Sequence, residues 1–506
     1  MPILKHKLTK TLITSVTTLA SNQSVIAANV ANEAIAKHII LFIGDGMNIE
    51  HEIAASRYLY GDDFALSFHK LPYKGNVATW DIDTYKHWSG GSYNPDAIVP
   101  KLGYNVDKVG NKPYPLSSEK PGAQEYCIAM AGDSAAAATA MATGYKTEDG
   151  NVAWIFGDKD IGGNRNNDGS LQTITELLRA NKGYSIGVVS TVPFSHATPA
   201  SFVSHNKNRG DYFRIASEIL TVTKPDVVIG GGHPGYDANP IYKFISAEDY
   251  AALKSGQYAN EYVFVERTAM QDGAIALFKA VEQALLSDKK LFGLFGIKGL
   301  GNFESMEPQD FPDLPVVRRK TYENPSLAET TLAALQVLSK NQNGMFLMAE
   351  QGDIDWANHA NDFSRMIGNV SDLHNAVQAV IDFVNRPGDA INWNNTLLIS
   401  TSDHSHSYMR NKTKLGAGNL PQQEGQCNYG ATPPCTYPKG EITYVSNNHS
   451  NELVRLYAKG VGIDLLRKYE NNDWYGKNRI LDNTHIFHVM MEAAGLPQPP
   501  RINLAK

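Results

Sequence analysis

Short apolar runs alternate with longer segments of helical spacing along most of this chain. Runs rich in β-branched or aromatic residues predict strands. These runs are Lys37–Ile43, Tyr184–Ser190, Pro225–Ile229, Lys290–Phe295, Gly344–Ala349, Asn395–Thr401 and Leu453–Ala458. Their alternation with helical segments predicts an α/β fold, in which a largely parallel central sheet carries helices on both faces.

One intervening helix can be placed closely. Asn324 fits its N-cap position and Pro325 its first helical position. Its apolar stripe consists of Leu327, Leu332, Leu335 and Leu338. By contrast, the segments 84–122 and 408–446 lack clear periodicity and are rich in turn-forming residues. We expect both to be surface insertions that border the site or a partner surface.

Polar clusters begin where the predicted strands stop. They are Asp45, Ser195–Thr198, Glu350 and Asp403-His404. In open parallel sheets, ligands bind outside the carboxyl ends of the strands. We therefore expect one edge of the sheet to gather all of these side chains.

Length and charge narrow the class of protein. A chain of 506 residues suits one large α/β domain with insertions, or two or three ordinary domains. The formal net charge is −6 and the basic residues are scattered, so nothing favours nucleic acid as a specific partner. Since there is no run of about 18 apolar residues, we expect no membrane span.

The N-terminus has the features of an export signal, which we place at residues 1–28. Three lysines among the first ten residues precede the stretch Leu12–Val25, and small residues follow it. Because that stretch is rich in Thr and Ser, a disordered or amphipathic leader is the alternative. An export signal predicts a periplasmic or secreted protein, with its main domain at residues 37–506.

Cysteine usage agrees with export. Cys427 and Cys435 lie close together in a loop, where a short disulfide would suit an oxidising compartment. Cys127 stands alone, and we interpret it as a small buried hydrophobe rather than a nucleophile. The cysteine spacing is not that of a metal site.

Asp133-Ser134 opens the alanine-rich segment 134–143. At the first turn of a helix, backbone N–H groups and the helix dipole stabilise negative charge, so an alkoxide or a phosphoryl group would be favoured at Ser134. The alternative is that this serine only caps the helix.

Asp355 and His359 have the strongest ligand spacing, because positions i and i+4 share one helix face. Asp45 stands between two glycines, which permit close backbone approach to a ligand. His449 supplies a further imidazole. Each signal has a structural alternative, such as a capping Asp beside an unrelated surface His. Their joint presence with Ser134 favours several metal ions around one phosphate.

Taken together, these residues resemble the metal-dependent alkaline phosphatases of the bacterial and vertebrate type. The resemblance covers most of the chain from Lys37 to the C-terminus. The matching motifs are Phe42–Met47, Asp133–Ala136, Thr198–Ala200, Glu350, Ile354–His359, Ser402–His406 and Ile486–Met490. The resemblance implies an alkaline-phosphatase-like fold, and a homodimer that hydrolyses small phosphate monoesters through a phosphoserine and releases inorganic phosphate.

The resemblance also implies a role for each site residue. Two Zn2+ ions and one Mg2+ ion would be bound, and a hydroxyl group coordinated to zinc is a better nucleophile than a free one. The first zinc would be held by Asp355, His359 and His449, the second by Asp45, Asp403 and His404, and the magnesium-type site by Asp45, Thr198 and Glu350. Ser134 would be the nucleophile, and the Arg209 fork would clamp two phosphoryl oxygens.

Two positions depart from the enteric bacterial pattern. His196 stands beside the third site where enteric members have Asp, while vertebrate members have His, so the identity of the third ion stays open. Trp356 replaces a Lys, and it either packs over the substrate or belongs to the core. We interpret His205 and His406 as supporting or solvated side chains rather than ligands.

Two other functions compete with this hypothesis. A phosphodiesterase or sulfatase-like relative of the same superfamily is the alternative within the enzymes. Against it stand the full third site, with Thr198 and Glu350, and Arg209. The alternative outside the enzymes is a metal-bound protein that binds phosphate without hydrolysing an ester. Ser134 speaks against it, because a protein that only binds phosphate does not need a nucleophile.

Overall fold

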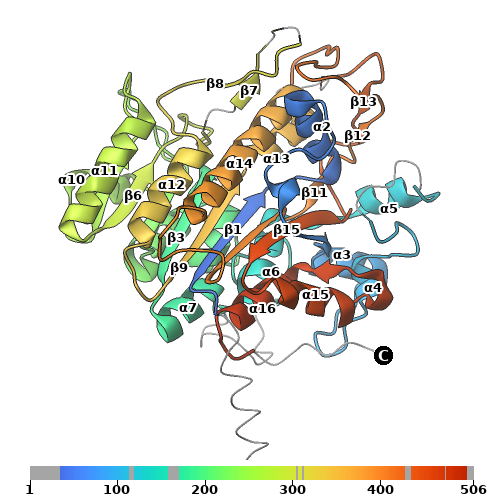
Figure 1. The fold of residues 1–506 in the computed structure, drawn as a ribbon, viewed down its shortest axis with the longest axis horizontal. Coiled ribbons are helices and arrows are strands. Elements are labelled where there is room, and N and C mark those ends of the chain that lie inside the picture. Colours follow the sequence, from blue (N-terminus) through green and yellow to red (C-terminus); the bar gives the residue numbers. More distant parts are fainter. Residues whose placement is uncertain are drawn as a thin grey trace, which may run out of the picture. The chain divides into compact units, whose positions relative to one another are not determined.

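Ten strands form one sheet in the computed structural model, which describes residues 35–112, 119–155, 157, 170–303, 306–309, 311, 313–427, 435–472 and 474–498 (Figure 1). The strand order is β16-β2-β15-β10-β1-β9-β3-β4-β6-β5. Neighbours from β10 to β5 run parallel, whereas β15 is antiparallel to both of its neighbours. The predicted α/β fold with a largely parallel sheet is confirmed.

The strands of this sheet include all seven that the apolar runs predict. Their bounds are β1 His38–Gly44, β2 Tyr73–Ala78, β3 Ser185–Pro193, β4 Val227–Gly231, β5 Tyr262–Glu266, β6 Lys290–Leu294, β9 Met345–Gln351, β10 Thr396–Thr401, β15 Val454–Gly460 and β16 Leu481–Asp482. The sequence did not indicate β2, β5 or β16, because they are half-buried, polar or very short. Three two-stranded sheets are formed by β7 Met306–Pro308 with β8 Val317–Arg319, β11 Ser405–His406 with β14 His449–Ser450, and β12 Arg410–Asn411 with β13 Ile442–Thr443.

Helices connect the strands and cover both faces of the large sheet. Their bounds are α2 Ile49–Tyr60, α3 Ile82–Ser89, α4 Pro100–Gly103, α5 Ala123–Ala129, α6 Ser134–Thr143, α7 Ile174–Lys182, α8 Ala197–Val203, α9 Tyr212–Glu218, α10 Ala247–Ser255, α11 Gly273–Ser287, α12 Leu327–Leu338, α13 Asp353–His359, α14 Phe363–Val384, α15 Ile463–Asn472 and α16 Asn483–Ala493. Within the described part of the chain, no helix combines the length and the apolar character that crossing a bilayer requires.

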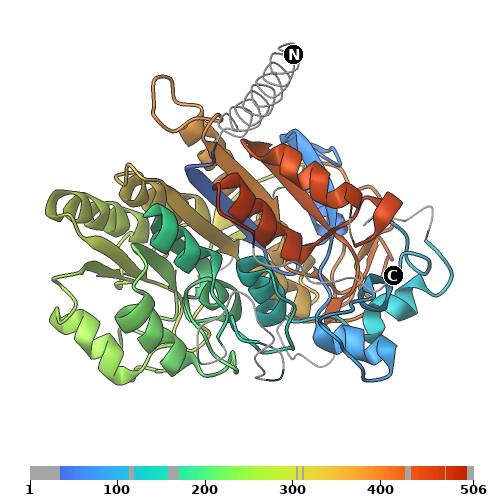
Figure 2. The same cartoon turned by 90° about the horizontal axis from the view of Figure 1, so that it is seen from below.

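Alternate side chains of the central strands enter two different cores. Ile39 and Leu41 of β1 pack with α6, α7, α8 and α16 on one face, while Ile40 and Phe42 pack with α2, α11, α12 and α14 on the other. Figure 1 and Figure 2 show these two helix layers with the sheet between them. Because both faces are buried, β1 is apolar at consecutive positions rather than at alternate ones.

The predicted N-cap of α12 is wrong. Ser326, not Asn324, caps this helix, since its hydroxyl accepts from the Glu329 N–H while the Glu329 carboxylate accepts from the Ser326 N–H. This reciprocal pair satisfies two otherwise unpaired donors. Asn324 instead accepts a hydrogen bond from the Gly296 N–H.

The segment 84–122 has more structure than a surface loop. It contains the end of α3 and all of α4, and Tyr85, Ile98 and Tyr104 are buried in a small core with Trp80. Aromatic residues spaced without a period bury their rings here, so periodicity could not reveal this core. Residues 113–118 and 428–434 of the two predicted insertions, like the predicted signal peptide, lie outside the described residues.

The cysteine predictions are confirmed. Cys427 and Cys435 form a disulfide. Cys127 is a free, fully buried thiol, and burial raises its pKa well above the ordinary value. A thiol in this state is a poor nucleophile.

Candidate metal centre

The site lies at the carboxyl ends of four parallel strands, which end at the same level of the sheet. These strands are β1, β3, β9 and β10. Glu350 of β9 is in register with Ile43 of β1 and Ser190 of β3, and Ile43 is in register with Thr401 of β10. Asp45 follows β1 directly, and Asp403 follows the end of β10. As expected from the strand ends, one edge of the sheet gathers these polar residues.

One group of side chains, which we call the imidazole group, consists of Asp355, His359, His406 and His449. Asp355 and His359 lie one turn apart on α13, and His406 pairs with His449 across β11 and β14. Nε2 of His359 is 3.4 Å from Asp355 Oδ2, and Nε2 of His449 is 3.3 Å from Asp355 Oδ1. Nitrogen and carboxylate ligands at these separations are typical of a zinc site.

Backbone carbonyls orient two of the imidazoles. Nδ1 of His359 is 2.8 Å from the Asn447 carbonyl oxygen, and Nδ1 of His449 is 2.9 Å from the Gly132 carbonyl oxygen. A carbonyl oxygen only accepts, so each Nδ1 carries a ring proton and each Nε2 faces Asp355; in the neutral imidazole the lone pair lies on Nε2. Such outer partners fix the tautomer that a metal needs.

His406 is completely buried, so it is not a solvated side chain. Its Nε2 is 3.3 Å from Asp355 Oδ1, and its Nδ1 is 2.6 Å from the Ser407 hydroxyl. These contacts agree with a side chain that supports Asp355. Its position in the imidazole group also makes it a possible ligand by distance.

A second group consists of Asp45, Asp403 and His404, and we call it the mixed group. Nε2 of His404 lies 3.3 Å from Asp45 Oδ1 and 3.4 Å from Asp403 Oδ2. The Gly46 N–H donates to Asp403 Oδ1 at 3.0 Å, which fixes that carboxylate. Gly46 has a positive φ and a Cβ there would lie 3.0 Å from Asp355 Oδ1, so only glycine fits between the two groups.

A third group, the oxygen group, consists of Asp45, Thr198 and Glu350. All three are fully buried. Among the described residues, Asp45 Oδ1, Thr198 Oγ1 and Glu350 Oε1 have no hydrogen-bond partner. Orphaned buried oxygens cost free energy unless a ligand satisfies them. A hard cation that prefers oxygen, such as magnesium, fits this set.

The carboxyl groups of the centre have strongly shifted pKa values. Burial, followed by the charges of Asp403, Asp355 and Glu350, raises the pKa of Asp45 well above its usual range. Burial raises the pKa of Glu350 to about 8. Burial acts on Asp355 in the same direction, but the surrounding imidazoles hold its pKa well below the ordinary value. Carboxylates packed in this way repel one another unless cations lie between them.

Ser134 occupies the first position of α6 beside the mixed group. Its hydroxyl oxygen lies 3.3 Å from His404 Nε2 and 3.5 Å from Asp45 Oδ2. Asp133 caps the helix by accepting from the Ala136 N–H at 2.9 Å. Every residue of α6 is buried, and its alanines leave room for close packing against α8 and α16. The hydroxyl is thus held at a buried helix N-terminus.

Arg209 is joined to the start of α6 through Asp133, which caps that helix. Its Nη1 donates to Asp133 Oδ2 at 2.8 Å, and its Nη2 lies 3.3 Å from His196 Nε2. A guanidinium only donates, so His196 accepts at Nε2 and carries its ring proton on Nδ1. Burial and the charge of Arg209 lower the pKa of His196 to about 3, which keeps this imidazole neutral. To ligate an ion through Nδ1, His196 would have to release that proton.

Two aromatic rings flank His196. Trp356 meets it edge-on with 5.9 Å between centroids, and Tyr212 stacks on it at 6.4 Å. Trp356 is half-buried, so it is not a core residue. Tyr212 was not predicted from the sequence, and its only signal there is its position three residues after Arg209.

His205 lies away from the centre. Its Nδ1 is 2.8 Å from Glu218 Oε1 and its Nε2 is 3.4 Å from Glu176 Oε2. Burial would lower its pKa, but these two carboxylates raise the pKa to about 10. His205 therefore supports the packing of α7 and α9. Ser190, which the sequence did not single out, donates to Glu350 Oε2 and orients that carboxylate.

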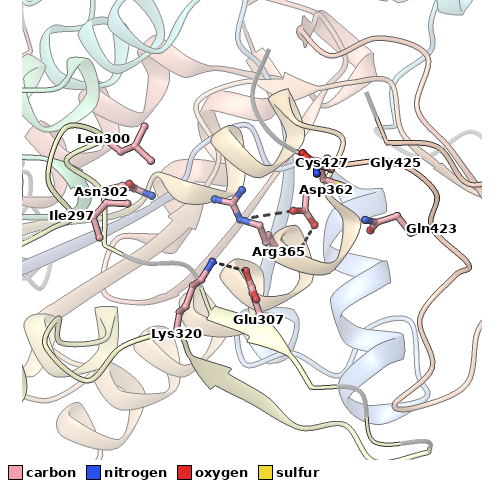
Figure 3. Close-up of a pocket in the computed structure, with 11 residues that line it drawn as sticks. Ile297, Leu300, Asn302, Glu307, Lys320, Asp362, Arg365, Gln423, Gly425 and Cys427 are labelled. Atoms are coloured by element: carbon pink, nitrogen blue, oxygen red, sulfur yellow. Dashed lines mark hydrogen bonds and ion pairs between the residues drawn. The ribbon is translucent and has the colours of Figure 1, made fainter. Parts of the chain in front are cut away.

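A separate pocket of about 420 Å³ contains none of the predicted site residues (Figure 3). Its lining residues are Ile297, Leu300, Asn302, Glu307, Lys320, Asp362, Arg365, Gln423, Gly425, Gln426 and Cys427. Arg365 Nε is 3.8 Å from Asp362 Oδ2, and Lys320 Nζ is 3.8 Å from Glu307 Oε1. Its opposite charges face one another, so the pocket offers no single sign of charge to a ligand.

The chain is similar to known proteins of one family. The alkaline phosphatase family model matches residues 117–437, well over half of the chain. Alkaline phosphatase 3 of Bacillus subtilis (strain 168) is 28% identical over 381 residues, which cover 74% of this chain but only 62% of that protein. Alkaline phosphatase of Escherichia coli (strain K12) is 27% identical over 531 residues, covering 98% of this chain and 94% of that protein. A solved variant of TAB5 alkaline phosphatase with Mg bound in its M3 site shares the fold, with a TM-score of 0.57, 21% identity, and coverage of 92% of this chain and 100% of that one.

Proposed function

The chain belongs to the alkaline phosphatase family of metal-dependent, phosphatase-type hydrolases, and from this premise we propose that it hydrolyses small phosphate monoesters through a phosphoserine at Ser134. One observation carries the proposal. The Ser134 hydroxyl lies within 3.5 Å of Asp45 and His404, at the buried start of α6, and Arg209 is tied to the residue that caps the same helix.

We propose zinc at the imidazole group and at the mixed group, and magnesium at the oxygen group. The ligand chemistry supports this, since imidazoles suit zinc and oxygens suit magnesium. The Mg in the M3 site of the TAB5 variant supports the third assignment. When bound, such ions lower the pKa of an oxygen nucleophile and stabilise the attacking and leaving oxygens of an in-line displacement.

The protein's own residues then divide the remaining work. Ser134 Oγ attacks the phosphorus, the ester P–O bond breaks, and the alcohol leaves. Arg209 binds two oxygens of the phosphoryl group while Asp133 holds its guanidinium in place. Water next attacks the phosphorus, the bond to Ser134 Oγ breaks, and inorganic phosphate leaves. Trp356 and Tyr212 form an aromatic wall against which the alcohol part of the substrate packs.

The proposal also includes the cellular setting. Residues 1–28 direct the protein to the periplasm or outside the cell, and the mature protein is a homodimer. The Cys427–Cys435 disulfide supports an oxidising compartment. The alternative, a phosphodiesterase or sulfatase-like relative, is disfavoured by the complete oxygen group and by Arg209.

Turnover of p-nitrophenyl phosphate at alkaline pH tests the proposal. The wild-type protein and Ser134→Ala are each compared with added zinc and magnesium, and bis(p-nitrophenyl) phosphate is the diester control. We expect wild-type turnover of the monoester that falls about 10⁶-fold in the variant, as for deletion of a serine nucleophile in another hydrolase. Turnover that favours the diester, or that survives in Ser134→Ala, would contradict the proposal.

A further inference from the structure

A separate cluster of carboxylates lies beside the residues that precede α6. Asp81, Asp83 and Asp149 each offer an oxygen within 4.8 Å of the others. Asp81 caps α3, Asp83 lies in its first turn, and Asp149 lies in the loop that follows α6. The proposed catalytic chemistry uses none of them.

The burial of Asp81 and its unpaired carboxylate oxygen indicate that the cluster binds a ligand. This residue is only 1% exposed. One carboxylate oxygen accepts from the Thr84 N–H at 2.7 Å, but within the described residues the other has no hydrogen-bond partner. A carboxylate oxygen of Asp149 lies within 4.8 Å of one of Asp81, and two carboxylates cannot donate to each other. A buried, unpaired carboxylate oxygen beside a second carboxylate needs either a proton or a cation.

The two nearby lysines donate hydrogen bonds to groups outside the cluster, although the charge of Lys86 also acts on Asp83 and that of Lys146 on Asp81. The Lys86 ammonium donates to Glu148 at 2.7 Å. The Lys146 ammonium lies 3.0 Å from Asp482 and donates to the Trp80 carbonyl oxygen. Asp149 keeps part of its surface in solvent, yet desolvation, its contact with Asp81 and the charges of Asp81 and Asp133 raise its pKa to about 10.

The cluster is joined directly to the start of α6. Asp149 Oδ1 accepts from the Asp133 N–H at 2.9 Å, and the Asp149 N–H donates to Asp83 Oδ2 at 2.9 Å. A Cβ on Gly132 would lie 3.0 Å from the Asp81 Cγ, so the carboxyl packs against the backbone that precedes Asp133. Anything that fixes Asp149 therefore also fixes the residue that caps the nucleophile helix and holds Arg209.

We propose that Asp81, Asp83 and Asp149 bind a further divalent cation, of the calcium class, that braces the start of α6. Three carboxylates and no imidazole or thiolate select a hard ion over zinc. Asp83 is half-buried and Asp149 is exposed, so water can complete the six to eight oxygen ligands that calcium takes. Magnesium, with its stricter octahedral geometry, suits the open and irregular set less well.

Calcium binding to the zinc- and magnesium-loaded protein tests the proposal, measured by equilibrium dialysis with radioactive calcium. We compare the wild type with Asp149→Asn and Asp83→Asn. The amide oxygen that Asp149→Asn introduces can still accept from the Asp133 N–H, so this variant keeps the support of the helix cap. Asp107→Asn, an exposed site elsewhere, is the matched charge control. We expect one calcium ion fewer per chain in the two cluster variants, and no change in the control.

Thermal unfolding gives a second readout. Calcium at about a hundred times its dissociation constant should raise the melting temperature of the wild type by about 2–4 °C, and should not raise that of Asp149→Asn. Equal calcium binding by the wild type and both cluster variants would overturn the proposal. A second result would also overturn it: calcium leaves the melting temperature of the wild type unchanged, and Asp149→Asn melts at a higher temperature than the wild type. Asp81 and Asp149 would then share a proton instead of a cation.

Discussion

The imidazole group and the oxygen group lie side by side and differ in both chemistry and exposure. His359 and His449 of the imidazole group are half-buried, and backbone carbonyls accept from Nδ1 of each ring, so that each Nε2 faces Asp355. The oxygen group has no access to solvent, and three of its oxygens have no hydrogen-bond partner among the described residues. Under the proposed metal assignment, one sheet edge would hold a borderline-soft ion near solvent and a hard ion in the buried oxygen group. Asp45 contributes to both the mixed group and the oxygen group, and so connects the two sites.

Among the changes that test this comparison, removing the Asp355 carboxylate of the imidazole group should have the largest effect. In Asp355→Asn, we expect bound zinc to fall and kcat/KM to fall about a thousandfold, because loss of several kcal/mol of metal stabilisation corresponds to that factor. Metal content by mass spectrometry and turnover of p-nitrophenyl phosphate are measured together. Asp353→Asn, on the same helix, is the control and should keep its zinc. Full zinc content and full activity in Asp355→Asn would contradict the assignment of zinc to the imidazole group.

The oxygen group should make the stability of the metal-free protein depend on pH. The pKa of Glu350 is raised from 4.5 to about 8, so the folded, metal-free protein holds this proton longer than the unfolded chain does. Its contribution therefore makes the metal-free protein less stable as pH rises from about 4.5 to about 8. Urea unfolding after chelation should show a shallower decline in Glu350→Gln than in the wild type. Identical pH profiles for the two proteins would mean that Glu350 is not held in this state.

Replacing His196 should sharpen the selectivity of the oxygen group. In His196→Asp, a carboxylate replaces a neutral imidazole two residues before Thr198, so we expect magnesium affinity to rise about tenfold relative to zinc. Magnesium activation curves at fixed zinc measure this change. His196→Asn, which keeps this position uncharged, is the control and should leave the curves close to those of the wild type. A weaker response to magnesium in His196→Asp would show that this position does not govern the third ion.

The smallest effect is expected at the aromatic wall. Trp356→Phe should raise KM for aryl phosphates by about twofold to fivefold while kcat stays nearly constant, because packing of the alcohol part contributes ground-state binding. An alkyl phosphate substrate should respond less. Trp393→Phe, at a remote site against Lys459, is the control. A fall in kcat with unchanged KM would place Trp356 in the chemical step instead.

Much of the fold and most of the candidate site residues could be predicted because strand pattern and ligand type are local signals. The apolar runs identified the strands that carry Asp45, Glu350 and Asp403, and parallel strands bring such residues to one edge. The α12 cap was missed, because Asn-Pro competed with the capping box of Ser326 and Glu329. Tyr212 and Ser190 depend on packing between distant segments, which no local pattern reveals.

The sequence also could not predict the cluster of Asp81, Asp83 and Asp149. Asp81 and Asp83 resemble ordinary helix-capping acids in the sequence, and only the fold brings Asp149 against them. Which residues carry unpaired buried oxygens is a property of the packed chain, since it depends on every neighbour of each atom.

The most direct test of the account is a crystal structure of the metal-loaded protein with anomalous diffraction at the zinc edge. We predict strong zinc peaks at the imidazole group and at the mixed group, and no comparable peak among Asp45, Thr198 and Glu350. Density there should instead match a light ion with oxygen ligands. A zinc peak of equal strength at the oxygen group, or none at the imidazole group, would contradict the division on which the proposed chemistry depends.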